Sequence, residues 1–123
     1  MRTARQQRGD AAESEVADRL GAAGWLVLGR QVRVGRAEID ILAIDPGPPS
    51  AVVIVEVRFR ADRGYGLPEE TVDHRKWARL RGAAYRLRDG GFLPDGTPWP
   101  RLPVRFDLVV LEPGATRHHR HAA

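Results

Sequence analysis

The chain has 123 residues, of which 42% are hydrophobic and 29% charged, and it contains no cysteine. This length leaves no room for two independent cores, and the lack of cysteine excludes disulfides and cysteine-ligated zinc or iron–sulfur sites. The longest aliphatic run, residues 51–55, is too short to cross a bilayer, and the polar N-terminus is unlike a secretory signal. We therefore expect a single-domain cytoplasmic protein without a membrane partner.

The charge balance is positive and rests almost entirely on arginine. Lys and Arg number 20 against 16 Asp and Glu, which gives a formal net charge of +4, and Lys76 is the only lysine. The planar guanidinium group matches phosphate oxygens, so a polyanionic partner is one interpretation. A GC-rich genome, which replaces lysine with arginine without functional meaning, is the other. Composition alone does not separate the two.

The N-terminal third of the chain predicts an arm, a helix and a strand. Residues 1–9 are polar and basic and predict a flexible arm. Helical spacing of apolar residues predicts a helix over 10–23 with Asp10 as its N-cap. The apolar, glycine-bounded residues 25–30 predict the first strand.

Two further strands are predicted on either side of a proline-rich break. Residues 37–44 alternate, with Glu38, Asp40 and Leu42 on one face and Ile39, Ile41 and Ala43 on the other. After the break, the β-branched residues 51–60 predict a strand near the centre of a sheet. The short connection favours an antiparallel pair.

The remaining elements are a second helix and a last strand. A glycine-rich loop over 62–67 precedes a helix predicted over 68–88, and residues 92–103 predict a surface loop. Residues 104–111 predict the last strand, and 113–123 a flexible tail. The order α-β-β-β-α-β predicts an α+β domain over 10–112, a mixed sheet flanked by helices.

Carboxylates stand on strands where charge is costly. Asp40 lies in one predicted strand, and Glu56 stands among aliphatic residues in the next, with Arg58 on the same face. If these strands pair, Asp40 and Glu56 converge. A buried charge costs several kcal/mol, about the amount that pairing or metal binding must offset. A divalent cation such as Mg²⁺ or Mn²⁺ suits two converging carboxylates.

Two helix residues add to this pattern. Glu13 falls on the apolar face of the first helix, whereas Glu15 can pair with Arg19 on the solvated face. Lys76 falls on the apolar stripe of the second helix. We expect Glu13 to be the functional helix acid and Lys76 to reach Asp40 and Glu56.

Each of these residues also has a purely structural interpretation. Asp40 and Glu56 could form a buried network with Arg58 or Arg36 that needs no metal. Glu38 could be solvated at a sheet edge, and Lys76 could extend past the core to solvent. The joint placement of the residues, rather than any one of them, favours function.

Two segments resemble a known family. Residues 37–43 (AEIDILA) and 55–60 (VEVRFR) are similar to motifs of the YraN-like family of bacterial proteins. Residues 13–24, 66–80 and 105–107 resemble that family's opening helix, second helix and closing strand. The family is assigned to the restriction-endonuclease-like, PD-(D/E)XK nuclease fold.

The resemblance implies metal-dependent hydrolysis of phosphodiester bonds in DNA, with branched or single-stranded forms as candidate substrates. It implies one or two Mg²⁺ or Mn²⁺ ions held by Asp40 and Glu56 with help from Glu13, and Glu38 as a secondary acid. The sequence departs from the family at the motif lysine, which is Arg58 here. Arginine stays protonated, so Arg58 can contact a phosphate but not deprotonate water. We expect Lys76 to replace the missing lysine in part.

The arginines of the second helix are candidates for contacts with nucleic acid, and two other functions are compatible with the sequence. Arginines of the second helix would grip the DNA backbone without reading sequence, or would form an ordinary solvated face: Arg75, Arg79, Arg86 and Arg88. A nucleic-acid-binding module that lost catalysis is the first alternative, and an assembly protein without a nucleic-acid role is the second. A homodimer is compatible with either. The tail histidines, His118, His119 and His121, are expected to be disordered rather than metal-binding.

Overall fold

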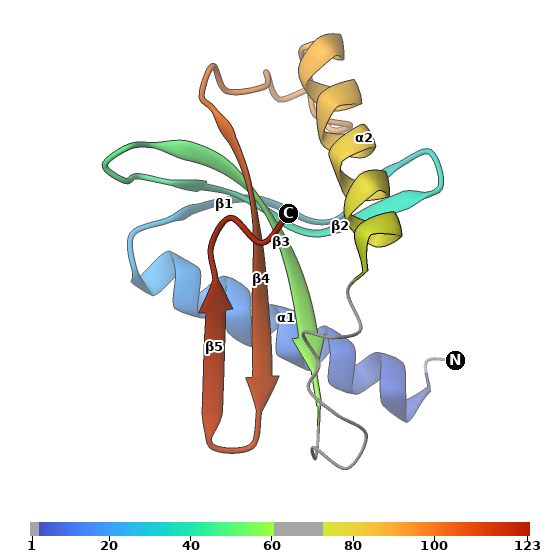
Figure 1. Ribbon diagram of the computed structural model, residues 1–123, viewed down its shortest axis with the longest axis vertical. Coiled ribbons are helices and arrows are strands. Elements are labelled where there is room, and N and C mark those ends of the chain that lie inside the picture. Colours follow the sequence, from blue (N-terminus) through green and yellow to red (C-terminus); the bar gives the residue numbers. More distant parts are fainter. Residues whose placement is uncertain (1–2, 61–72) are drawn as a thin grey trace.

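The computed structural model describes residues 3–60 and 73–123. In chain order its elements are α1 (Ala4–Ala22), β1 (Leu26–Val34), β2 (Ala37–Asp45), β3 (Ala51–Phe59), α2 (His74–Gly90), β4 (Val104–Glu112) and β5 (Ala115–His119) (Figure 1). The five strands of this part form one sheet in the order β1-β2-β3-β4-β5. Neighbours are antiparallel except β3 and β4, which are parallel. The mixed α+β fold is therefore confirmed, with β3 at the sheet centre and antiparallel to β2 as predicted.

The helix α1 covers one face of the sheet. Its buried residues Val16 and Leu20 belong to one apolar cluster with Ile41, Val53 and Val55 from the central strands. The opposite edge of α1 carries exposed polar residues, including the predicted Glu15–Arg19 ion pair at 3.1 Å. Glu13 lies on the buried face, as its spacing predicted.

The helix α2 belongs to a second apolar cluster on the other face. Leu80 and Ala84 are buried there together with Leu42 and Ile54 of the sheet, and Trp77 joins them. The buried face of α2 consists of Trp77, Leu80, Ala83, Ala84 and Leu87. No helix within the described ranges is both long and apolar enough to span a membrane.

Both predicted flexible ends differ from the structure. The helix α1 begins at Ala4, not Asp10, because Thr3 caps it: its hydroxyl accepts from the Gln6 backbone N–H at 3.1 Å, and the Gln6 side chain accepts from the Thr3 backbone N–H at 2.8 Å. Residues 4–9 of the expected arm are thus helical. The tail expected over 113–123 is wrong as well, because β5 pairs along β4 from Glu112 to Leu108.

The second helix runs from His74 to Gly90, so within the described residues it begins one residue later and ends two residues later than the prediction of 68–88. Asp73 caps α2 by accepting from the Lys76 backbone N–H at 3.0 Å. Gly91 ends the helix in the left-handed conformation, at φ 83°. The loop predicted over 62–67 and the helix start predicted over 68–72 lie outside the described residues.

Candidate functional site

The backbone pairing between strands β2 and β3 ends next to Asp40. Their backbone pairing runs from Asp45 opposite Ala51 to Ile41 opposite Val55. One residue beyond, the Asp40 carboxylate accepts a hydrogen bond from the Val57 backbone N–H at 2.9 Å. The side chain therefore takes the place of the next ladder partner and is fixed between the two strands.

The predicted alternation of β2 fails at the same point. Ile39 lies in the apolar cluster on the α2 side together with Leu42, whereas Ile41 lies in the cluster on the α1 side. The neighbouring strand is irregular at the same point, since Gln31 of β1 lies between the partners of Ile39 and Ile41 and has a positive φ of 49°. This irregularity leaves Asp40 outside both apolar clusters.

Glu56 is buried on β3, with 2% of its surface exposed. Its Oε1 atom lies 3.2 Å from Lys76 Nζ and 3.4 Å from an Arg58 nitrogen. Its Oε2 atom is buried and accepts no hydrogen bond from any described residue. Lys76 thus contacts Glu56, one of the two acids it was expected to reach, and Arg58 shares the face of Glu56. We call Asp40, Glu56, Arg58 and Lys76 the acid-pair site.

Both carboxylates of the acid-pair site have raised pKa values, and burial is the largest cause for each of them. Burial and the charge of Asp40 raise the pKa of Glu56 to about 7, against the opposing effects of Lys76 and Arg58. Burial also raises the pKa of Asp40, although the Val57 hydrogen bond and Lys76 oppose this. A protonated Glu56 can donate a hydrogen bond to Asp40. At neutral pH this buried pair therefore favours an additional proton or an additional cation.

Glu13 lies beside the acid-pair site rather than within it. Its carboxylate pairs with Arg30 at 3.2 Å, and burial together with the charge of Asp40 raises its pKa. Glu13 and Asp40 both line a cleft of about 440 Å³ between α1 and the first two strands. Among residues 3–60 and 73–123, no three Asp, Glu or His side chains form a ready-made metal-binding group.

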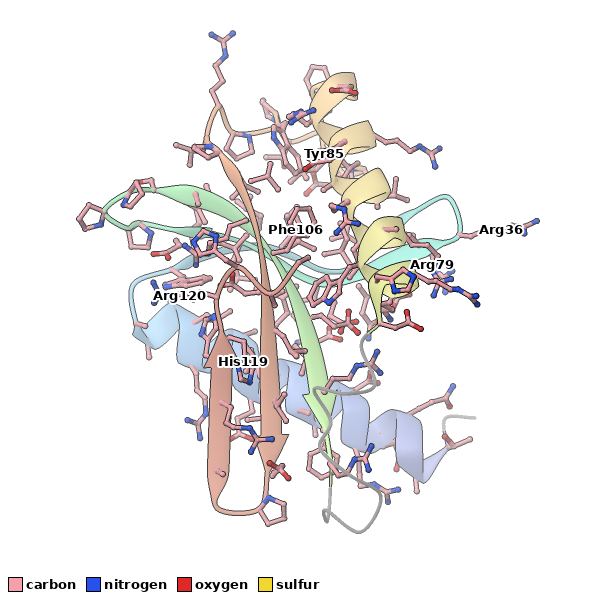
Figure 2. All side chains as sticks on the ribbon, viewed as in Figure 1. Arg36, Arg79, Tyr85, Phe106, His119 and Arg120 are labelled. Carbon is pink, nitrogen blue, oxygen red and sulfur yellow. The ribbon has the colours of Figure 1, made fainter. Side chains whose placement is uncertain are left out.

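A second cleft reaches Asp40 from the α2 side. It has a volume of about 550 Å³ and carries the cationic side chains Arg36, Lys76 and Arg79. Glu38 and Asp40 line both clefts. Glu38 pairs with Arg33 of β1 at 3.4 Å and is partly exposed. Figure 2 shows Arg36 and Arg79 reaching toward the same side of the molecule. The acid-pair site thus opens onto a basic cleft.

Of the four arginines expected to contact nucleic acid, three lie on one stripe of α2 and the fourth does not. Arg75, Arg79 and Arg86 are exposed, and their spacing of four and seven residues puts them on one stripe of α2. An Arg86 nitrogen comes within 2.9 Å of the position that a Cβ on Gly35 would occupy, at the β1–β2 turn. Arg88 points elsewhere, over the Tyr85 ring at 4.5 Å.

A second buried charge cluster was missed by the sequence analysis. Arg105 donates two hydrogen bonds of 2.9 Å to Asp107 and lies 2.9 Å from Asp45. His118 of β5 lies 2.8 Å from Asp107, so the tail histidine is bound rather than disordered. We call these four residues the Arg105 cluster. The signal was available, because Asp107 interrupts an aliphatic strand just as Glu56 does.

The oxygen atoms of the acid-pair site fit a hard divalent cation. Glu56 Oε2 is buried without a donor, and Asp40 uses Oδ2 for the Val57 N–H. Carboxylate oxygens are the ligands that Mg²⁺ and Mn²⁺ prefer. The pKa of Glu56 is raised to about 7, and a bound cation would lower it by stabilising the ionised carboxylate.

These features define a class: an α+β protein with a mixed sheet, a pair of acids on two diverging strands of which Glu56 is buried and Asp40 half-buried, and a basic cleft beside them. The chain belongs to the uncharacterised protein family UPF0102, whose family pattern matches residues 12–111. The YraN-like resemblance is confirmed to that extent.

Members of the family from distant bacteria match over most of their length. A UPF0102 protein of Persephonella marina is 42% identical over 115 residues, covering 94% of this chain and 91% of its own. A UPF0102 protein of Symbiobacterium thermophilum is 40% identical over 108 residues, covering 86% and 82%. One from Moorella thermoacetica is 39% identical over 112 residues, covering 90% and 85%.

Proposed function

We propose that the protein is a metal-dependent DNA endonuclease of the restriction-endonuclease-like superfamily, acting in the cytoplasm on branched or single-stranded DNA. The observation that carries the proposal is the acid-pair site. It combines two carboxylates with raised pKa values, the buried Glu56 and the half-buried Asp40, and opens onto a cleft lined by cations. That combination suits a phosphodiester and a divalent cation together.

Asp40 and Glu56 would hold Mg²⁺ or Mn²⁺, with Glu13 contributing from the cleft wall. When bound, the cation would activate a water molecule and neutralise charge on the scissile phosphate. The protein supplies the position of the carboxylates: Val57 fixes Asp40 at 2.9 Å, and burial in β3 fixes Glu56.

The cations of the site would bind and orient the substrate. Arg58 and Lys76 both contact Glu56 Oε1 and would approach a phosphate held at the acid pair. Negative charge that develops on the phosphate is stabilised by such fixed donors. The exposed stripe of Arg75, Arg79 and Arg86 would bind the backbone independently of sequence.

A nucleic-acid-binding module without catalysis is the second candidate, and Arg58 favours it. Arginine cannot serve as a neutral base, and the two cations already pair with Glu56. In this case the acid pair would be a structural network beside a DNA-binding cleft.

Incubation of the purified full chain with single-stranded, duplex and branched DNA and Mn²⁺ separates the candidates. The nuclease proposal expects cleavage that falls at least about 100-fold in Asp40→Asn, since a metal ligand is lost. Asp89→Asn, on the exposed face of α2, is the matched control and should cleave normally. Cleavage that survives Asp40→Asn unchanged would contradict the proposal.

DNA binding without cleavage by the wild-type chain would favour the module. In that case Arg58→Lys, which restores the family's motif residue, provides the second test. Cleavage gained by Arg58→Lys would identify a nuclease fold that lost catalysis through this substitution. No retardation of any DNA at low salt would contradict both candidates.

A further inference from the structure

A separate pocket lies at the opposite end of α2 from the acid-pair site. It has a volume of about 580 Å³ and is lined by Phe92, Pro98, Trp99, Pro100, Leu102 and neighbouring residues. Along the helix axis, the twelve residues from Lys76 to Arg88 correspond to about 18 Å. Figure 1 shows the segment after α2 folding back at that end toward β4. The pocket is therefore distinct from both clefts at Asp40.

The loop that forms this pocket is held by its own backbone. Phe92 and Pro98 form an isolated β-bridge. The Leu93 N–H donates to the Thr97 carbonyl at 2.7 Å, and the Trp99 N–H donates to the Gly91 carbonyl at 2.9 Å. A pocket with such a fixed wall needs little ordering when a ligand binds.

The pocket exposes apolar surface on this fixed loop. Phe92 is 58% exposed although it is a large aromatic residue. Trp99 is only 8% exposed, and its indole N–H is buried without an acceptor in the described part of the chain. Its enclosed ring cannot stack on a nucleobase. An exposed apolar surface on a well-ordered loop is typical of a protein-binding site.

The charged residues that line the pocket are both arginines, Arg88 and Arg101. Both are exposed. Arg88 lies above the Tyr85 ring at 4.5 Å, and its Nε atom is 3.4 Å from the exposed carboxylate of Asp89. Guanidinium groups next to an apolar pocket complement a segment that carries carboxylates beside an apolar side chain.

We infer that this pocket docks an acidic peptide segment of a partner protein. An aromatic or aliphatic side chain of the segment occupies the space between Phe92 and Trp99. Its carboxylates pair with Arg88 and Arg101. The inference is independent of the proposed nuclease activity, because it uses no residue of the acid-pair site.

Fluorescence anisotropy with the full chain and a labelled peptide, Glu-Asp-Gly-Leu-Phe-Asp, tests the inference. We expect a dissociation constant of about 10–100 μM, typical of a short peptide in one pocket. Phe92→Ser and Arg101→Glu should each weaken binding by about tenfold or more. Leu26→Ser is the matched control, since Leu26 is 59% exposed on β1, and should leave binding unchanged.

Two comparison probes make the test specific. Peptides with serine for leucine and phenylalanine, or with lysine for the acids, should bind at least about tenfold more weakly. The NMR signal of the Trp99 indole N–H, assigned with Trp99→Phe, should shift with the acidic peptide and not with a short oligo-dT. Absence of peptide binding up to about 1 mM, equal binding of the altered peptides, or a shift caused by oligo-dT alone would overturn the inference.

Discussion

The molecule buries charge in two places with opposite consequences. In the Arg105 cluster, hydrogen bonds from His118 and Arg105 hold the pKa of Asp107 below its usual range, although burial alone would raise it. In the acid-pair site, burial and Asp40 raise the pKa of Glu56 to about 7 despite two nearby cations. In the Arg105 cluster the buried carboxylates are paired with Arg105 and His118, and the His118 contact joins β5 to the sheet. The acid-pair site is left short of positive charge where two clefts meet, as a site for a cation requires.

The largest loss of stability should follow from a substitution that breaks the Arg105 cluster. Asp107→Ala leaves Arg105, which is 8% exposed, without its bidentate partner. We expect a loss of about 3–5 kcal/mol in the free energy of unfolding, measured by urea denaturation at pH 7. A loss below about 1 kcal/mol would mean that the cluster does not hold the fold together.

The second effect concerns pH and Glu56. Because its folded pKa is about 7 and its ordinary value is 4.5, the folded state binds the extra proton between these values. Stability that depends on this proton is therefore lost as the pH rises from about 4.5 through 7. Glu56→Gln removes the titration, so the variant should gain about 2–3 kcal/mol relative to wild type between pH 5 and pH 8.

Asp107 supplies the contrast for that experiment. A lowered folded pKa contributes stability above the ordinary value of 3.8, and this is lost only as the pH falls through the folded pKa. In a His118→Gln background, which removes the titratable neighbour 2.8 Å away, Asp107→Asn should therefore differ from its parent by a constant amount between pH 5 and pH 8. If Glu56→Gln also differed by a constant amount, the contrast between the two clusters would be wrong.

A smaller effect should come from Lys76. Lys76→Met removes the cation 3.2 Å from Glu56, so the pKa of Glu56 rises further. We expect a loss of about 1–2 kcal/mol in unfolding free energy at pH 8 and little change at pH 5, where Glu56 is already protonated. Arg79→Met, an exposed neighbour on α2, should show no such pH dependence in the same denaturation series.

The smallest effect sets the baseline for surface charge. Glu15→Gln breaks the exposed pair with Arg19, whose partners are more than half exposed. Its cost should be about 0.3–0.5 kcal/mol by thermal denaturation and should vanish at high salt. A cost as large as that of Lys76→Met would show that burial is not what distinguishes the acid-pair site.

The sequence was sufficient to identify residues whose charge stands among apolar neighbours, because burying such a charge has a free-energy cost that the pattern itself indicates. A charge within an aliphatic strand or on an apolar helix face identified Glu13, Glu56 and Lys76, and the structure brings Lys76 and Glu56 together. The same argument applied to Asp107 was not made, so the Arg105 cluster was missed. The α-β-β-β-α-β core followed from periodicity and from the proline-rich break at 46–49.

The features that escaped prediction depend on long-range contacts. The change of face at Asp40 lies opposite Gln31 of the paired strand, whose positive φ could not be read from the alternation of the β2 residues. Strand β5 is short and polar, and it exists because β4 pairs with it and Asp107 binds His118. The spacing of the arginines in the sequence likewise could not show that the Arg88 side chain lies over the Tyr85 ring, away from the stripe formed by Arg75, Arg79 and Arg86.

The central claim is that Glu56 is held short of positive charge and that a divalent cation supplies it. An NMR titration of the Glu56 side-chain carboxyl carbon, with and without Mg²⁺, tests this directly. We expect a midpoint near 7 without the cation, as burial and Asp40 dictate. With millimolar Mg²⁺ the midpoint should fall by about one pH unit or more, and Asp40→Asn should abolish the Mg²⁺ effect. A midpoint near 4.5 without the cation, or one that Mg²⁺ leaves unmoved, would contradict the account.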